Sequence, residues 1–189
     1  FVDFPKPVDG ERDGFLFVSR LSAEKGVDVL AAALKQVDGL SCRVAGTGPD
    51  EQLLQSAPVE RLGALSTDAV RMEMSRALAL VLPSVWYENF PRTLVEAFGC
   101  GLPVIASRIG ALAELVEDGV TGLLFQPGDS ADLAGKLQWA KENPEKMRQM
   151  GMAARAKYDA CYTADKNYEQ LLCIYQDAMA AAAKGDKDE

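Results

Sequence analysis

Apolar residues of this chain gather in short runs, and between the runs they recur at the spacing of a helix face. Short unbroken runs are typical of strands that are buried on both faces of a sheet. The sequence therefore predicts strands at Phe15–Val18, Cys42–Ala45, Val59–Leu65, Leu78–Leu82, Val104–Ala106 and Gly122–Phe125, of which the third has the weakest pattern.

The segments between these runs have the pattern of amphipathic helices. Val27, Leu30 and Leu34 lie on one face of the first such helix. Thr67 can cap a later helix that ends near Arg76, because a threonine side chain accepts a hydrogen bond from the first turn. Further helices are expected from Pro49–Asp50, over Thr93–Gly99 and Ala111–Val116, around Leu133 and Leu137, from Pro144, and through Tyr168, Leu171, Leu172, Tyr175 and Met179.

Alternation of strands and helices with almost no hairpin signal requires crossover connections. We therefore predict an α/β fold of Rossmann-like type, with a mainly parallel sheet covered by helices on both faces. No strand is evident from Asp129 onward, so the fold should end in a helical C-terminal extension. Residues 1–183 are expected to form one domain and residues 184–189 a disordered tail.

Composition and charge narrow the range of partners. The 189 residues carry a net charge of −8, which argues against a nucleic-acid partner because phosphate-backbone binding needs a positive face. Histidine is absent, and the four cysteines follow no metal-binding spacing. No apolar run reaches the length of about 18 residues that a membrane span requires. We expect a cytoplasmic protein with reduced cysteines and, because the chain does not begin with methionine, a fragment of a longer polypeptide.

Candidate chemistry lies where the predicted strands end, since ligands of open parallel sheets bind outside the carboxyl ends of the strands. Arg20 and Lys25 follow the first strand, where two cations and free backbone amides could neutralise a diphosphate. Such residues are also ordinary on a protein surface. Gly46 and Gly48 follow the second strand, and they either let a ligand approach the backbone or simply form a turn.

The loop before the helix expected at Thr93–Gly99 is the most informative segment. The first amides of that helix, those of Thr93 and Leu94, are expected to lack intrahelical partners and to face a ligand. This end of a helix carries roughly half a positive charge, which suits a phosphate. Glu96 would then reach ribose hydroxyls, and Glu88 a sugar attached on the other side. Alternatively, Glu88 only favours the helix dipole and Glu96 is solvated.

Glu88 and Glu96 form an E-x7-E motif, and the segment from Pro83 to Gly101 resembles the corresponding stretch of the retaining GT-B glycosyltransferases of family 4. Other segments resemble the same family in its own order, over about residues 15–180. They are Phe17–Leu21 with Lys25–Gly26, similar to "G-R-L…K-G" with Ser19 where glycine is usual; Val44–Pro49, similar to "G-x-G-P"; and Leu62–Leu65, Gly101–Ser107, Gly110, Glu114, Gly119, Gly122 and Leu124.

The resemblance implies one half of a GT-B fold, the half that binds a nucleotide-sugar donor. Arg20 and Lys25 would bind the diphosphate and stabilise the departing nucleoside diphosphate, and Glu88 would contact the donor sugar or the charge at its anomeric carbon. These three are the implied catalytic residues. The implied nucleotide-binding residues are Arg20, Lys25, Gly46, Leu65, Thr93, Leu94 and Glu96. The implied donor-sugar residues are Glu88, Asn89, Phe90 and Pro91, with plain packing as the alternative for Phe90.

The implied reaction is transfer of a sugar, with retention of configuration, from a UDP- or GDP-linked sugar to an acceptor. The family requires no metal and no other cofactor. Its further catalytic residues, often including a histidine, lie on an N-terminal domain that is missing here, so the isolated chain should be inactive. The missing domain is an expected partner and could carry a peripheral membrane association. The last helix, with Tyr168, Leu171 and Tyr175, resembles the one that crosses back onto that domain in the family, with packing on its own domain as the alternative.

Two other functions remain open. The same architecture serves nucleotide-sugar epimerases, which transfer no sugar, and non-catalytic modules that bind a nucleotide and act through partners. A redox Rossmann domain is disfavoured, because Gly-x-Gly-x-x-Gly does not follow the first strand.

Overall fold

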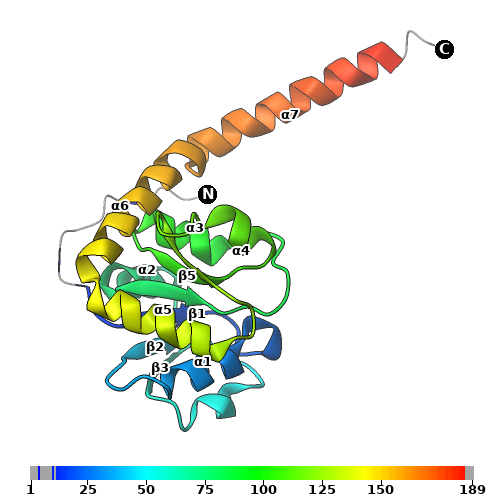
Figure 1. The fold of residues 1–189 in the computed structure, drawn as a ribbon. Coiled ribbons are helices and arrows are strands. Elements are labelled where there is room, and N and C mark those ends of the chain that lie inside the picture. Colours follow the sequence, from blue (N-terminus) through cyan, green and yellow to red (C-terminus); the bar gives the residue numbers. More distant parts are fainter. Residues whose placement is uncertain (1–3, 5–9, 11, 186–189) are drawn as a thin grey trace.

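The computed structural model describes Phe4, Gly10 and residues 12–185, with side chains up to residue 179, and its fold is shown in Figure 1. Strands and helices alternate as the sequence predicts. The strands are β1 (Phe15–Val18), β2 (Cys42–Ala45), β3 (Val59–Gly63), β4 (Ala79–Leu82), β5 (Val104–Ser107) and β6 (Gly122–Phe125). The helices are α1 (Val27–Leu34), α2 (Thr67–Arg76), α3 (Arg92–Gly99), α4 (Gly110–Leu115), α5 (Ser130–Glu142), α6 (Pro144–Cys161) and α7 (Ala164–Gly185), with short 3₁₀ helices η1 (Ala23–Lys25) and η2 (Glu51–Leu54).

The strands form one parallel sheet in the order β3-β2-β1-β4-β5-β6. β1 pairs with β2 on one side and with β4 on the other, so that Phe15 lies opposite both Cys42 and Ala79. This is the doubly wound order in which a crevice opens between the first and fourth strands, outside their carboxyl ends. The predicted Rossmann-like fold is confirmed.

Successive side chains of each strand face opposite sides of the sheet, and each side has its own apolar core. Phe15 and Phe17 of β1 pack with buried residues of α1 and α5, whereas Leu16 packs with those of α2, α3 and α4. α6 contributes to both cores, since Met147 belongs to the first and Tyr158 to the second. Helices therefore cover both faces, and the carboxyl edge of the sheet is left for the connecting loops.

Local capping decides where several helices begin. α5 follows Asp129, whose carboxylate accepts hydrogen bonds from two first-turn amides at 2.9 and 3.0 Å. Pro144 is the first residue of α6, where its missing N–H removes no helical hydrogen bond. α2 is capped by the side chain of Ser66, so the cap predicted at Thr67 is wrong by one residue. The helix expected from Pro49–Asp50 is the single 3₁₀ turn η2.

α7 projects away from the rest of the domain (Figure 1). Its side chains between residues 165 and 179 are exposed. They include the large apolar residues Tyr168, Leu171, Leu172, Ile174, Tyr175 and Met179. The helix continues to Gly185, past the domain boundary expected at 183, and residues 186–189 of the expected tail lie outside the described part of the chain.

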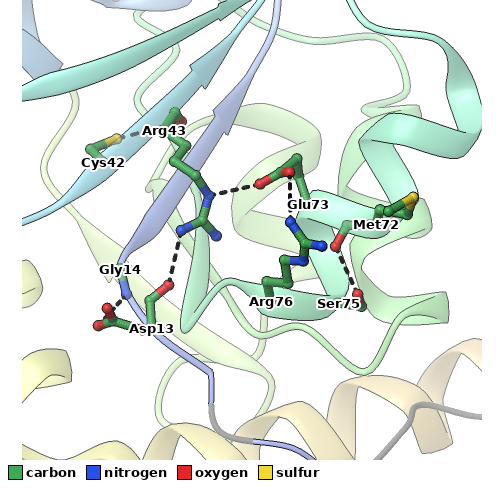
Figure 2. Close-up of polar contacts among 8 residues, drawn as sticks. All are labelled: Asp13, Gly14, Cys42, Arg43, Met72, Glu73, Ser75 and Arg76. Atoms are coloured by element: carbon green, nitrogen blue, oxygen red, sulfur yellow. Dashed lines mark hydrogen bonds and ion pairs between the residues drawn. The ribbon is translucent and has the colours of Figure 1, made fainter.

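An ion pair joins α2 to the sheet beneath it. Nε of Arg43 on β2 and a carboxylate oxygen of Glu73 on α2 are 2.8 Å apart, and both side chains are 16% exposed. Figure 2 shows Arg76 near the same carboxylate, at 3.6 Å, and the Arg43 guanidinium donating to the Asp13 carbonyl at 3.4 Å. Nε and the terminal Nη2 of Arg43 make no well-directed hydrogen bond to the described residues, so its contact with Glu73 is chiefly electrostatic.

Replacing Glu73 by alanine should lower the free energy of unfolding by about 2–3 kcal/mol, because the largely buried Arg43 loses its counter-charge. Urea unfolding followed by circular dichroism measures the change. Glu145→Ala is the matched control, since it removes an exposed partner of Arg148 on α6 and should change the free energy of unfolding much less, because exposed ion pairs contribute little. Equal losses in the two variants would show that the Arg43–Glu73 pair does not hold α2.

Candidate functional site

The loops that follow β1, β2 and β4 meet at the carboxyl edge of the sheet. The Leu21 amide of the first loop donates to the Thr47 carbonyl of the second at 3.0 Å. The Val85 amide of the loop after β4 donates to the Glu24 carbonyl at 3.1 Å. The loop after β1 is thus tied by its backbone to both neighbours, and cavities lie at both junctions.

The larger cavity lies over the ends of β1, β2 and β3 and has a volume of about 520 Å³. That volume is in the range typical of small-ligand sites, roughly 300–1,000 Å³. Three of the predicted nucleotide-binding residues line it, namely Arg20, Gly46 and Leu65. Val70 of α2 also lines this cavity. The sequence analysis missed Val70 because it considered only residues that directly follow a predicted strand.

The smaller cavity, of about 90 Å³, lies over the ends of β1 and β4, where the strand order reverses. Val18 and Ser19 line both cavities, so the two adjoin along the end of β1. The predicted residues that line the smaller cavity are Lys25, Glu88, Phe90, Pro91 and Thr93. Residues predicted from two separate loops and one helix are therefore brought together here.

Lys25 and Glu88 form an ion pair within the smaller cavity. The Lys25 ammonium donates to Oε1 of Glu88 at 2.6 Å, and the two side chains are 26% and 22% exposed. The buried hydroxyl of Ser84 donates to the same oxygen at 2.8 Å. The sequence analysis missed this role of Ser84. The only signal for it was the position of Ser84 just after β4, four residues before Glu88 in the same loop.

The N-terminus of α3 faces the smaller cavity through Thr93. The Thr93 amide has no partner among the described residues, as predicted. The Leu94 amide, by contrast, donates to the Pro91 carbonyl at 3.0 Å, and the Leu94 side chain is buried in the core. The expectation that both amides lack partners is therefore wrong for Leu94, because a tight turn at Pro91 brings a carbonyl within reach.

Glu96 and Asn89 are not among the residues that line the two cavities. The Glu96 side chain is 28% exposed and lies 3.5 Å from the guanidinium of Arg92, one turn earlier on α3. The Glu96 carboxylate thus lies on the first turns of α3, paired with an arginine that is exposed to solvent. Asn89 is exposed in the loop that precedes it.

The side chain of Arg20 is exposed and makes no hydrogen bond or contact ion pair with the part of the chain that the structure describes. Its positive charge acts on Glu24 nearby. A hydrogen bond of 2.6 Å from the Ser22 hydroxyl lowers the pKa of Glu24 most, and the charges of Arg20 and Lys25 lower it further. Glu24 is thus a carboxylate at neutral pH, and Arg20 remains available to an incoming anion.

The glycines of these loops are required by contacts within the protein. A Cβ at Gly46 would lie 1.8 Å from the Ser19 carbonyl oxygen, and one at Gly48 would lie 2.1 Å from the Leu21 carbonyl oxygen. A Cβ at Gly26 would lie 1.9 Å from the carbonyl oxygen of Pro83. Gly46 does line the larger cavity, but its lack of a side chain serves the packing of the β1 loop against the β2 loop.

The described residues contain no group of three or more histidine, cysteine, aspartate or glutamate side chains that could hold a metal ion. Burial raises the pKa of Cys42 to about 12 and that of Cys100 to about 11, so neither is a thiolate nucleophile at neutral pH. Within the same part of the chain, no helix has the length and apolar character needed to cross a membrane.

Residues 2–157 match the family model described as glycosyl transferases group 1. An uncharacterised glycosyltransferase of Methanocaldococcus jannaschii is 33% identical over 76% of this chain and 42% of its own length. The glycogen synthase of Mycobacterium tuberculosis is 31% identical over 91% of this chain and 43% of its own length. The chain thus spans less than half the length of these relatives.

Two solved structures have the same fold. HepE of Anabaena, in complex with UDP-glucose, has a TM-score of 0.79 and 26% identity, over 88% of this chain and 49% of its own. Sucrose-phosphate synthase from Thermosynechococcus elongatus has a TM-score of 0.81 and 29% identity, over 92% of this chain and 47% of its own.

Gly46→Ala should lower the free energy of unfolding by about 3 kcal/mol or more, because its Cβ would collide with the Ser19 carbonyl and force the β1 loop to move. Gly63→Ala is the matched control. Gly63 also has a positive φ, of 67°, but a Cβ there meets nothing within 4 Å, so only backbone strain of about 1 kcal/mol is expected. Urea unfolding compares the two, and equal losses would contradict the packing role of Gly46.

Proposed function

This chain belongs to the family of glycosyl transferases group 1, and on that premise we propose that it is the donor-binding half of a retaining GT-B glycosyltransferase of family 4. The donor would be a nucleotide diphosphate sugar, UDP- or GDP-linked. The observation that supports the proposal most directly is the pair of adjoining cavities at the carboxyl ends of β1, β2, β3 and β4, which are lined by the cations Arg20, Lys25 and Arg92.

The two cavities suit the two ends of such a donor. The larger one, which holds Gly46 and Leu65 at its wall, has room for a nucleoside. The smaller one holds Glu88 and is flanked by the donor-sugar candidates Phe90 and Pro91. A diphosphate placed between the cavities would lie along the end of β1, within reach of the loop that carries Arg20 and Lys25.

Each proposed contact uses the chemistry of its residue. Arg20 would grip the diphosphate through its planar fork of donors, and Lys25 would act as a point charge. The unpartnered Thr93 amide at the start of α3 would donate to a phosphate oxygen, aided by the helix dipole. Glu96 would accept from ribose hydroxyls, and Asn89 would contact the sugar beside Glu88. Leu94 would contribute only if its amide left the Pro91 carbonyl.

The chemistry that we propose is departure of the nucleoside diphosphate with transfer of the sugar to an acceptor. Negative charge develops on the leaving diphosphate, and preorganised cations at that point lower the barrier. Arg20 and Lys25 would supply this stabilisation without a metal or other cofactor. Glu88 would stabilise the charge that develops at the anomeric carbon.

A complete enzyme would also need a surface that binds the acceptor. We propose that this surface belongs to a second, N-terminal domain, and that α7 with its exposed apolar residues packs on that domain. The domain could also carry a peripheral membrane association in the cytoplasm. The isolated chain should then bind nucleotide without transferring sugar.

A thermal-shift panel of UDP, GDP and ADP tests the binding proposal. One of the three should raise the melting temperature, since a ligand at 100 times its Kd stabilises the native state by about 2.7 kcal/mol. Glu96→Ala should reduce that shift, whereas Glu169→Ala, a matched change in a helical carboxylate paired with Lys166 on α7, should not. Absence of any shift in the unmodified chain would contradict the proposed function.

The catalytic proposal is tested in an enzyme that contains this domain together with an acceptor domain. Arg20→Ala should lower kcat by about 10²–10³-fold, equivalent to roughly 3–4 kcal/mol of transition-state stabilisation. Arg148→Ala, which removes an arginine of α6 that pairs with Glu145, is the control and should leave turnover unchanged. Wild-type turnover in the Arg20 variant would refute the role assigned to that residue.

A further inference from the structure

Two cations line the smaller cavity, and the one inside the strand crevice, Lys25, is already paired with a carboxylate, whereas Arg92 is 82% exposed and lies 3.5 Å from Glu96. Lys25 donates to Glu88 at 2.6 Å, and neither side chain is more than 26% exposed. A diphosphate that arrived at Lys25 would therefore meet an ammonium group whose charge is shared with a carboxylate. This arrangement weakens the attraction for an anion in a chain whose net charge is −8.

The carboxylate is held in place by more than the ion pair. The buried Ser84 hydroxyl donates to the same oxygen, Oε1, at 2.8 Å. The loops that carry Lys25 and Glu88 are joined by the Val85–Glu24 backbone hydrogen bond, and Gly26 packs on the Pro83 carbonyl where no side chain would fit. The geometry is thus fixed by both loops, so Glu88 would remain beside Lys25 when a ligand binds.

A negative charge fixed at this point acts unequally on the two diphosphates of the proposed reaction. A nucleoside diphosphate with a free terminal phosphate has a second ionisation near pH 6 and carries up to one more negative charge than the same diphosphate bonded to a sugar. Glu88 therefore repels the free nucleoside diphosphate more than the sugar-linked donor.

We propose that Glu88, held by Lys25 and Ser84, is a specificity determinant that weakens the binding of the free nucleoside diphosphate relative to the sugar-linked donor. This inference rests on the proposed function, because it requires the diphosphate to bind beside Lys25. Its consequence is that the carboxylate that stabilises charge at the anomeric carbon also promotes release of the nucleoside diphosphate after the sugar has passed to the acceptor. Ser84, whose hydroxyl donates to Glu88, is then a positioning residue for the Glu88 carboxylate.

Glu88→Gln separates charge from shape. The amide oxygen can still accept from Lys25 and Ser84, while the negative charge is lost. Titration calorimetry with UDP, GDP and ADP should show that this variant binds the preferred nucleoside diphosphate about three- to tenfold more tightly than the unmodified chain, as expected for removal of one like charge at close range. The gain for the corresponding UDP-glucose or GDP-glucose should be smaller.

Two further variants make the result specific. Glu88→Asp keeps the charge and should bind the nucleoside diphosphate within about twofold of the unmodified chain, since the Coulomb term is nearly preserved. Glu117→Gln is the matched control, because it removes a carboxylate that pairs with Lys157 at 2.7 Å outside the residues lining either cavity. It should leave both affinities unchanged. Melting temperatures without ligand show whether each variant is folded, and Glu88→Ala replaces Glu88→Gln if the latter is not.

The possible outcomes distinguish the two proposals. If the unmodified chain binds none of the three nucleoside diphosphates, the proposed function fails. If it binds one of them and loss of the Glu88 charge leaves that affinity unchanged or lowers it, the inference on Glu88 fails while the proposed function stands. Equal gains for the nucleoside diphosphate and its sugar-linked form would likewise overturn the selectivity assigned to Glu88.

Discussion

The parallel pairing of β1 with both β2 and β4 is the constraint on which the candidate site depends. It places three connecting loops at one edge of the sheet and sets them at strand spacing. At that spacing the backbones of the loops approach closely, which is why Gly26 and Gly46 face carbonyl oxygens at distances that no side chain could occupy. The cavities therefore follow from the fold itself, and they exist before any ligand binds.

The charge of the site is local and opposes the charge of the chain. A net charge of −8 would repel a diphosphate at long range, so capture must depend on groups within a few ångströms. Three cations line the cavities, and they are in different states. Lys25 is held by Glu88, the exposed Arg92 lies 3.5 Å from Glu96, and the exposed side chain of Arg20 has no contact partner among the described residues. In the proposed function, net attraction for an anion would therefore come mainly from Arg20, Arg92 and the Thr93 amide.

The sequence predicted β1, β2, β4, β5 and β6 well because these strands are largely buried on both faces and so form short apolar runs. The edge strand β3, whose pattern was weakest, has exposed residues at Glu60 and Arg61. Predictions failed where a neighbour distant in sequence, or one hydrogen bond, decides the geometry. Glycine is required at position 46 because the Ser19 carbonyl lies too close for a side chain, and the Leu94 amide is paired because the turn at Pro91 places a carbonyl beside it. The contact of Ser84 with Glu88 depends on the path of a loop, which no periodicity encodes. The family motifs pointed to the candidate site, but the hydrogen bonds and ion pairs of its residues could be seen only in the structure.

Because Lys25 is paired and Arg20 is exposed, the two cations would contribute differently to the binding of the proposed diphosphate. Lys25 is already fixed in place by Glu88, so its ordering costs little on binding. Its attraction for a ligand is reduced by the Glu88 charge, and more so for a ligand with more negative charge. Arg20 must be ordered by its ligand, which costs up to about 2 kcal/mol of side-chain entropy and must be offset by a bidentate grip. A ligand with only one phosphate oxygen in reach would not offset that cost. If the proposed function holds, the site would therefore favour a diphosphate over a monophosphate by its geometry as well as by its charge.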